Sequence, residues 1–183
     1  MKKILLILVF AVLTASQALA ETPESLAMSY FNLLKTRQWD NIGSLYDPGT
    51  LQEFRESMSF LGELPDESSS DVLSNFFGPG TTRESLKAMT DAQFFSGFLQ
   101  GVLTQTAQLG QFDFKKIDVL GSIAEGDGIR HVVTRTSLEV GDISLESMEV
   151  ISFKKTEAGW KILLQGKIKG IAQQIRKVLA QSR

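Results

Sequence analysis

The sequence predicts an α+β domain in which helices precede a curved four-stranded antiparallel meander and an amphipathic helix ends the chain. Between residues 112 and 168, four runs rich in β-branched, aromatic and aliphatic residues are separated by EGDG, VGD and KTEAG. These short stretches carry the Gly and Asp that hairpin turns require. The residues before them repeat apolar side chains at helical spacing instead. Since one face of such a sheet needs a cover, we expect the N-terminal helices to pack on it.

Residues 1–20 have the pattern of a secretory signal peptide. Lys2 and Lys3 precede an apolar run over residues 4–13, and Ala18-Leu19-Ala20 supplies the small residues that a signal peptidase reads. The apolar run is far shorter than the roughly 20 residues that cross a bilayer. We therefore expect export to the periplasm or the medium, and a mature chain over residues 21–183 without a transmembrane segment.

Composition limits the classes of fold and partner. Removal of Lys2 and Lys3 leaves 17 basic against 21 acidic side chains, a formal charge of −4, which argues against nucleic acid as a partner. The chain has no cysteine, so its core must hold it together without disulfides. A chain of this length buries about 68–70% of its unfolded surface, which suffices for one domain. We expect a single domain over residues 21–183.

The helical part is predicted over residues 22–109. Thr22 followed by Pro23 opens the first helix, and the capping boxes Thr50–Glu53 and Thr90–Gln93 open two later ones. Residues 62–83 read as a long loop with one helical turn at 72–77. Eight of the eleven mature phenylalanines lie between residues 31 and 98, which favours a phenylalanine-rich lid over the sheet.

Gly97 and Gly101 lie four residues apart on one side of the last of these helices. In a chain outside a membrane, such a pair usually marks a place where another backbone comes close. We expect a neighbouring segment to pack there.

The sheet is predicted over residues 112–168. In its last strand one parity is apolar (Trp160, Ile162, Leu164, Ile168) and the other polar (Lys161, Gln165, Lys167), so one face is buried. The first strand changes parity once and the third strand twice, which predicts bulges and strong bending.

Adjacent valines indicate that the outer face of the sheet is partly apolar. Val132 and Val133 point opposite ways, as do Val150 and Ile151. Two covers are open: a second subunit in a twofold dimer, or a terminal amphipathic helix over residues 170–182. The helix would present the stripe of Ile171, Ile175, Val178 and Leu179.

Few residues could carry chemistry. His131 is the only histidine, and one histidine without cysteine cannot supply an ordinary zinc site. We expect no metal and no cofactor. Asp118 and Glu149 could converge as acid and base, although solvated strand carboxylates are much commoner.

The order of elements over residues 24–168 resembles the nuclear transport factor 2-like superfamily, also called ketosteroid-isomerase-like, and in particular its small secreted bacterial members. The resemblance includes one local motif, an acidic, Gly-containing turn before Trp-Lys-Ile (Glu157, Gly159 and residues 160–162). It implies a cone in which helices close a curved sheet around a pocket. Family members include enzymes, small-ligand binders and dimerisation modules. The catalytic tyrosine and carboxylates of the isomerases have no match here, so no catalytic residue is carried over.

The leading functional prediction is an exported, non-catalytic domain that binds a small apolar ligand, or a protein partner, in or on the cone. The alternatives are a cofactor-free isomerase, cyclase or hydrolase and a purely structural dimer. The candidate pocket residues are Tyr30, Tyr46, Phe94, Phe98, Asp118, His131 and Glu149. Two or more ionisable side chains among them would have to point into one cavity for the enzyme alternative to hold.

Overall fold

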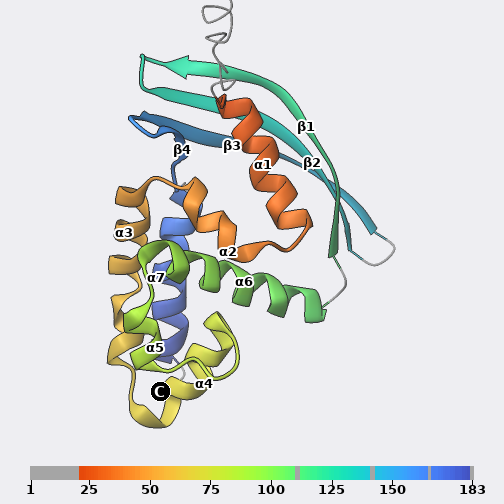
Figure 1. Cartoon of the computed structure of the whole chain (residues 1–183). Coiled ribbons are helices and arrows are strands. Elements are labelled where there is room, and N and C mark those ends of the chain that lie inside the picture. Colours follow the sequence, from red (N-terminus) through yellow and green to blue (C-terminus); the bar gives the residue numbers. More distant parts are fainter. Residues whose placement is uncertain (1–20, 110–111, 141–142, 165, 182–183) are drawn as a thin grey trace, which may run out of the picture.

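The structure is a computed structural model that describes residues 21–109, 112–140, 143–164 and 166–181. It confirms the α+β class (Figure 1). The helical part comprises α1 (Pro23–Lys35), α2 (Trp39–Ile42), α3 (Pro48–Ser57), α4 (Asp66–Phe77), α5 (Arg83–Ala88) and α6 (Asp91–Leu109), with short 3-10 turns at Gly43–Leu45 and Ser59–Glu63. The sheet comprises β1 (Phe112–Glu125), β2 (Ile129–Val140), β3 (Ile143–Thr156) and β4 (Gly159–Ile162), and α7 (Gly166–Gln181) follows it.

The four strands form an antiparallel meander in the order β1-β2-β3-β4. β1 shifts register against β2 between Phe114 and Lys116 and again between Val119 and Gly121, so the bulges predicted for this strand are confirmed. β3 pairs with β2 without interruption, and the bulges predicted there are wrong. The apolar residues of β3 change parity because some of them, Met148 and Val150, lie on the outer face and remain exposed there.

α1 lies across the inner face of the bent sheet (Figure 1). Val132 and Ile151 point to this inner face and are buried, whereas Val150 is exposed on the other side, so the predicted opposition of these neighbours is confirmed. Trp160 shares the inner face with Ile162 but is only half-buried. The core between α1 and the sheet is thus built by aliphatic and aromatic side chains from both.

The phenylalanine-rich helices pack mainly on one another rather than as a lid on the sheet. The ring of Phe54 on α3 lies 5.4 Å from that of Phe95 and 5.2 Å from that of Phe98, both on α6. The ring of Phe77 on α4 lies 4.8 Å from that of Phe94, with the two rings tilted against each other. α6 therefore forms the centre of a helical core, and α1 provides most of the helical cover of the sheet.

Several predicted boundaries are wrong. The third helix begins at Pro48, with Asp47 as its N-cap, because the Asp47 carboxylate accepts the Thr50 N–H at 3.3 Å. Much of the predicted loop 62–83 is helical, since α4 spans twelve residues. The sheet ends at Ile162 and α7 begins at Gly166, four residues before the predicted position. Ile168 fits both the alternation of the last strand and the apolar stripe of the terminal helix, and in the structure it belongs to α7.

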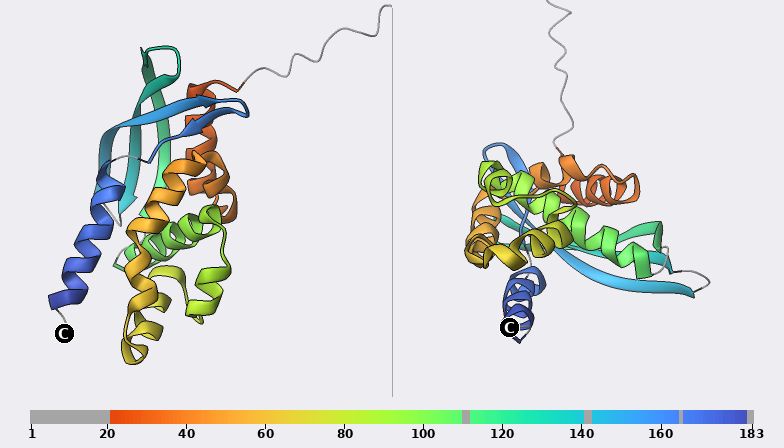
Figure 2. Two further views of the ribbon diagram at one scale, coloured as in Figure 1. Left: turned by 90° about the vertical axis from the view of Figure 1, so that its left-hand side faces the viewer. Right: turned by 90° about the horizontal axis from the view of Figure 1, so that it is seen from below.

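α7 packs against α3, so its position shows whether the terminal helix covers the outer face of the sheet. Ala172 is buried, and the Arg176 guanidinium lies 4.8 Å from the centre of the Phe60 ring. Figure 2 shows α7, in dark blue, beside α3 rather than across the sheet. The terminal helix therefore does not cover the outer face.

Candidate functional site

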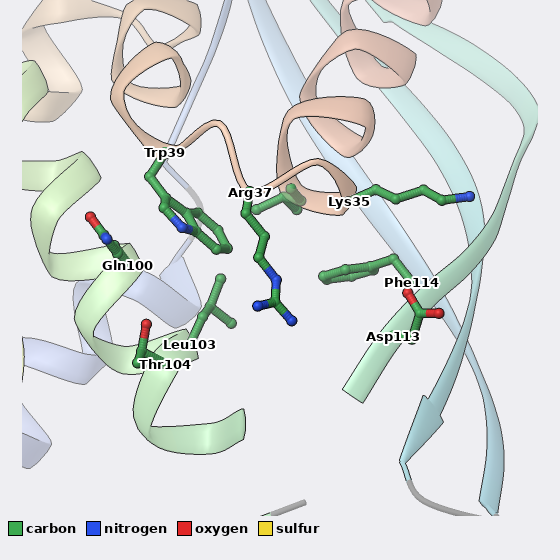
Figure 3. Close-up of a pocket in the computed structure, with 9 residues that line it drawn as sticks. Lys35, Arg37, Trp39, Gln100, Leu103, Thr104, Asp113 and Phe114 are labelled. Carbon is green, nitrogen blue, oxygen red and sulfur yellow. The ribbon is translucent and has the colours of Figure 1, made fainter. Parts of the chain in front are cut away.

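A cleft of about 290 Å³ lies where the end of α1, the second half of α6 and the start of β1 meet (Figure 3). We call it the α1–α6–β1 cleft. Its lining residues are Leu34, Lys35, Arg37, Trp39, Gln100, Leu103, Thr104, Asp113 and Phe114. Charged, aromatic and neutral polar side chains from α1, α2, α6, β1 and the turn between α1 and α2 are thus gathered around one opening.

The turn after α1 sets the position of Arg37. The Arg37 N–H donates to Leu34 O at 3.2 Å and the Gln38 N–H to Leu33 O at 2.9 Å, the paired bonds that end many helices. Such a turn needs a left-handed residue, usually glycine, and Arg37 takes this place with φ 56°. Among the described residues, Arg37 alone has a positive φ without being glycine. The chain thus places a long cation where glycine is favoured by about 1 kcal/mol.

Aromatic and aliphatic side chains flank Arg37 in the cleft. Figure 3 shows Arg37 projecting into the cleft, with Trp39 and Leu103 on one side and Phe114 on the other. Gln100 and Thr104 are four residues apart on α6, so both present their polar ends beside Leu103. A flat apolar body would therefore contact rings on two sides.

The acidic residue of the cleft is already neutralised. Asp113 Oδ2 lies 2.9 Å from Lys115 Nζ, and Lys115 also lies 2.9 Å from Glu139. The Lys115 hydrogen bond lowers the pKa of Asp113, and the nearby Lys35 and Arg37 charges act in the same direction. The carboxylate therefore stays ionised and occupied by Lys115.

The two cations that line the cleft differ, because the Lys35 side chain is hydrogen-bonded and that of Arg37, within the part of the chain that the structure describes, is not. Lys35 Nζ donates to Lys115 O at 3.4 Å. The Arg37 guanidinium, in contrast, makes no ion pair or hydrogen bond with any residue that the structure describes. Its charge is available to a ligand.

A second cleft, of about 260 Å³, adjoins the first and shares Lys35 and Phe114 with it. It lies between α1 and β1, with the half-exposed Met28 at its rim. The Thr136 hydroxyl that lines it is buried and has no hydrogen-bond partner among the described residues. The two clefts together extend the space available beside Phe114.

Two of the predicted site residues, Tyr30 and Tyr46, come together in the core, whereas a third, Glu149, is exposed on β3. The rings of Tyr30 and Tyr46 lie 6.0 Å apart, and Glu149 acts on both electrostatically from the inner face of β3. Burial raises the pKa of Tyr30 and raises that of Tyr46 further, so both hydroxyls are neutral at physiological pH. They are packed among core side chains and do not line the clefts described above.

The other predicted residues are dispersed. Phe94 and Phe98 belong to the helical core. Asp118 forms an ion pair with Lys116 at 2.9 Å on the outer face of the sheet. Glu149 of β3 lies opposite Thr134 of β2, and its side chain is on the inner face. Asp118 and Glu149 therefore cannot act together as acid and base.

His131 lies on the outer face of β2. Its Nδ1 is 2.9 Å from Ser152 Oγ and its Nε2 is 2.7 Å from Glu125 Oε2. A hydroxyl, an imidazole and a carboxylate are thus joined in series, on a side of the sheet where the clefts described above do not lie.

The candidate residues predicted from the sequence did not include Lys35, Arg37 or Trp39. The available signal was a tryptophan two residues after an arginine at a helix end. Within the described residues, no group of three or more His, Asp or Glu side chains is placed to hold a metal, and no helix has the length and apolarity to cross a membrane. Comparison with protein-family models, curated proteins and solved structures finds no match to this chain.

Proposed function

We propose that this protein is an exported, non-catalytic binding domain whose α1–α6–β1 cleft takes a small ligand with a flat apolar body and an anionic group. The observation that carries the proposal is the unpaired Arg37 guanidinium, held in the cleft by a left-handed backbone. Left-handed non-glycine residues concentrate at functional sites, because the surrounding structure must impose them. The resemblance to nuclear transport factor 2-like proteins, some of which bind small ligands, agrees with this proposal.

Chemistry and size define the class of ligand. A guanidinium presents a planar fork of donors that matches a carboxylate, sulfonate or phosphate. Trp39 and Phe114 supply ring faces for the apolar part. At about 290 Å³ the cleft is near the lower limit of about 300 Å³ for ligand pockets, which favours a ligand of one or two rings. A purely apolar ligand enclosed in the cone has less support, since Tyr46, Phe95 and Phe153 fill the interior.

Arg37→Gly is expected to separate binding from stability. Loss of the guanidinium should weaken binding of 1-naphthoate about fivefold to tenfold, the effect of one hydrogen-bonded ion pair that stays partly hydrated. Glycine suits φ 56°, so the free energy of unfolding should be unchanged or about 1 kcal/mol higher. Isothermal titration calorimetry and urea denaturation measure the two quantities.

The neutral alcohol 1-naphthalenemethanol is the matched control ligand for this experiment. It keeps the two rings and lacks the charge, so its affinity should change little on Arg37→Gly. Equal affinity of wild type and Arg37→Gly for 1-naphthoate would refute the assignment of Arg37 as the anion-binding residue.

A cofactor-free hydrolase is a second candidate, and one observation favours it: the series Ser152–His131–Glu125. In enzymes such a series activates the hydroxyl as a nucleophile. A fluorophosphonate probe tests it, because an activated Ser152 would be labelled in wild type and spared in His131→Ala. We expect no labelling of Ser152, since the series lies outside the clefts described here.

A further inference from the structure

The second half of the sheet has a free edge along β3. β4 pairs with β3 only from Phe153 to Thr156, and none of the described strands flanks residues 143–151 on that side (Figure 1). Of the eight large apolar side chains that the described part of the chain exposes, four lie on this segment: Ile143 (61%), Leu145 (48%), Met148 (63%) and Val150 (47%). The apolar exposure of the protein is thus concentrated where strand pairing is incomplete.

Hydrogen bonds at the end of β3 show which backbone groups face this edge. Ser152 O accepts from the Leu163 N–H at 2.8 Å, on the β4 side, whereas the Lys155 N–H donates to Gly128 O, on the β2 side. In an antiparallel strand the N–H and C=O of one residue point the same way, and successive residues alternate. Because the β2–β3 register is unbroken, Ser144, Glu146, Met148 and Val150 present their backbone N–H and C=O groups to the free edge.

The two edges of the sheet differ in protection. Edge strands of soluble proteins are usually protected by bulges, lysines or prolines. β1 has two bulges and carries Lys115 and Lys116. Residues 143–151 contain no bulge, lysine, arginine or proline. Of β1 and residues 143–151 of β3, only the latter are therefore open to a further strand.

We propose that β3 pairs antiparallel with β3 of a second copy of this chain, around a twofold axis, so that two sheets become one. This dimer uses the edge of the sheet rather than the outer face that the sequence suggested. It also closes by itself, because each copy uses residues 143–151 of β3 for the pairing and the long strand at the far side of each sheet is β1, the protected strand.

Charge selects the register. With the axis at Ser147, Met148 of one copy lies opposite Glu146 of the other, and Val150 lies opposite Ser144. All four edge residues then form hydrogen-bonded pairs, and no like charges face each other directly. An axis at Glu146 would place that carboxylate against its own copy, which destabilises strand pairing.

An axis at Met148 is excluded by a different contact. It would pair Ser144 with Ser152, whose carbonyl already accepts from Leu163. Ser147 is the remaining centre that uses the whole edge.

Sedimentation equilibrium of residues 21–183 tests the proposal, and we expect a dimer at micromolar concentration. Met148→Glu places two new carboxylates opposite Glu146 and should raise the dissociation constant about tenfold or more. Met148→Lys places a cation there and should retain the dimer. Ile123→Glu is the matched control, since Ile123 is 66% exposed on β1 and should not affect dimerisation.

Four outcomes would overturn the proposal. They are a monomeric wild type, equal dissociation by Met148→Glu and Met148→Lys, dissociation by Ile123→Glu alone, and a monomer that binds an extended peptide of alternating valine and lysine. The last would assign the edge to a basic partner that complements Glu146 and Glu149. Circular dichroism of each variant confirms that it is folded.

Discussion

Phe95→Ala is expected to lower the free energy of unfolding by about 3–5 kcal/mol, the range for deletion of a fully buried ring. Phe95 is 1% exposed and lies between the two parts of the core. Its ring is 4.6 Å from that of Tyr46, which contacts the sheet, and 5.4 Å from that of Phe54 in the helical core. The substitution should therefore create a cavity where the sheet and the helices meet.

Urea denaturation followed by circular dichroism measures this loss. Phe60→Ala is the matched control, because Phe60 is only half-buried beneath Arg176 and its loss should cost about 1 kcal/mol. A cost for Phe95→Ala no larger than that for Phe60→Ala would contradict the position of Phe95 at the centre of the core.

Gly101→Ala is expected to cost about 3 kcal/mol, the upper end of the usual range for overpacking. A Cβ at residue 101 would lie 2.1 Å from Phe76 O, a backbone atom of α4, so α4 and α6 would have to separate. No rotation of a side chain can relieve this contact.

Gly97→Ala provides the control on the same helix. Its Cβ would meet only the Phe77 ring at 3.5 Å, an ordinary contact, and alanine favours the helix by up to about 1 kcal/mol. We expect thermal unfolding to show a large decrease in Tm for Gly101→Ala and none for Gly97→Ala. Similar values for the two variants would refute the close approach of α4 to Gly101.

Features that depend on local pattern were predicted from the sequence. The Gly-rich turns place the meander, the parity change of β1 marks its bulges, and Gly101 marks the approach of another backbone. The start of α7 and the helix α4 were predicted wrongly, because Ile168 fits a strand as well as a helix and the serine-rich start of α4 resembles a loop. Tertiary packing decides between them.

The candidate site was not predictable in the same way. Trp39 and Phe114 are 75 positions apart in the chain and line the same cleft because α1, which packs on β1, also contacts α2. The left-handed conformation of Arg37 has no signal in the sequence, since glycine is the residue that normally indicates it. Its unpaired charge becomes evident only when its neighbours are known.

The most direct test of the proposed binding site is an NMR titration of the ¹⁵N-labelled protein with 1-naphthoate. The chain has two tryptophans, so its spectrum has two indole N–H signals that serve as probe and internal control. Trp39 lines the α1–α6–β1 cleft, whereas Trp160 lies on β4 opposite Lys155 and does not. We predict a saturable shift of the Trp39 signal with little change at Trp160. A shift confined to Trp160, or no saturable shift of either signal, would contradict binding in this cleft.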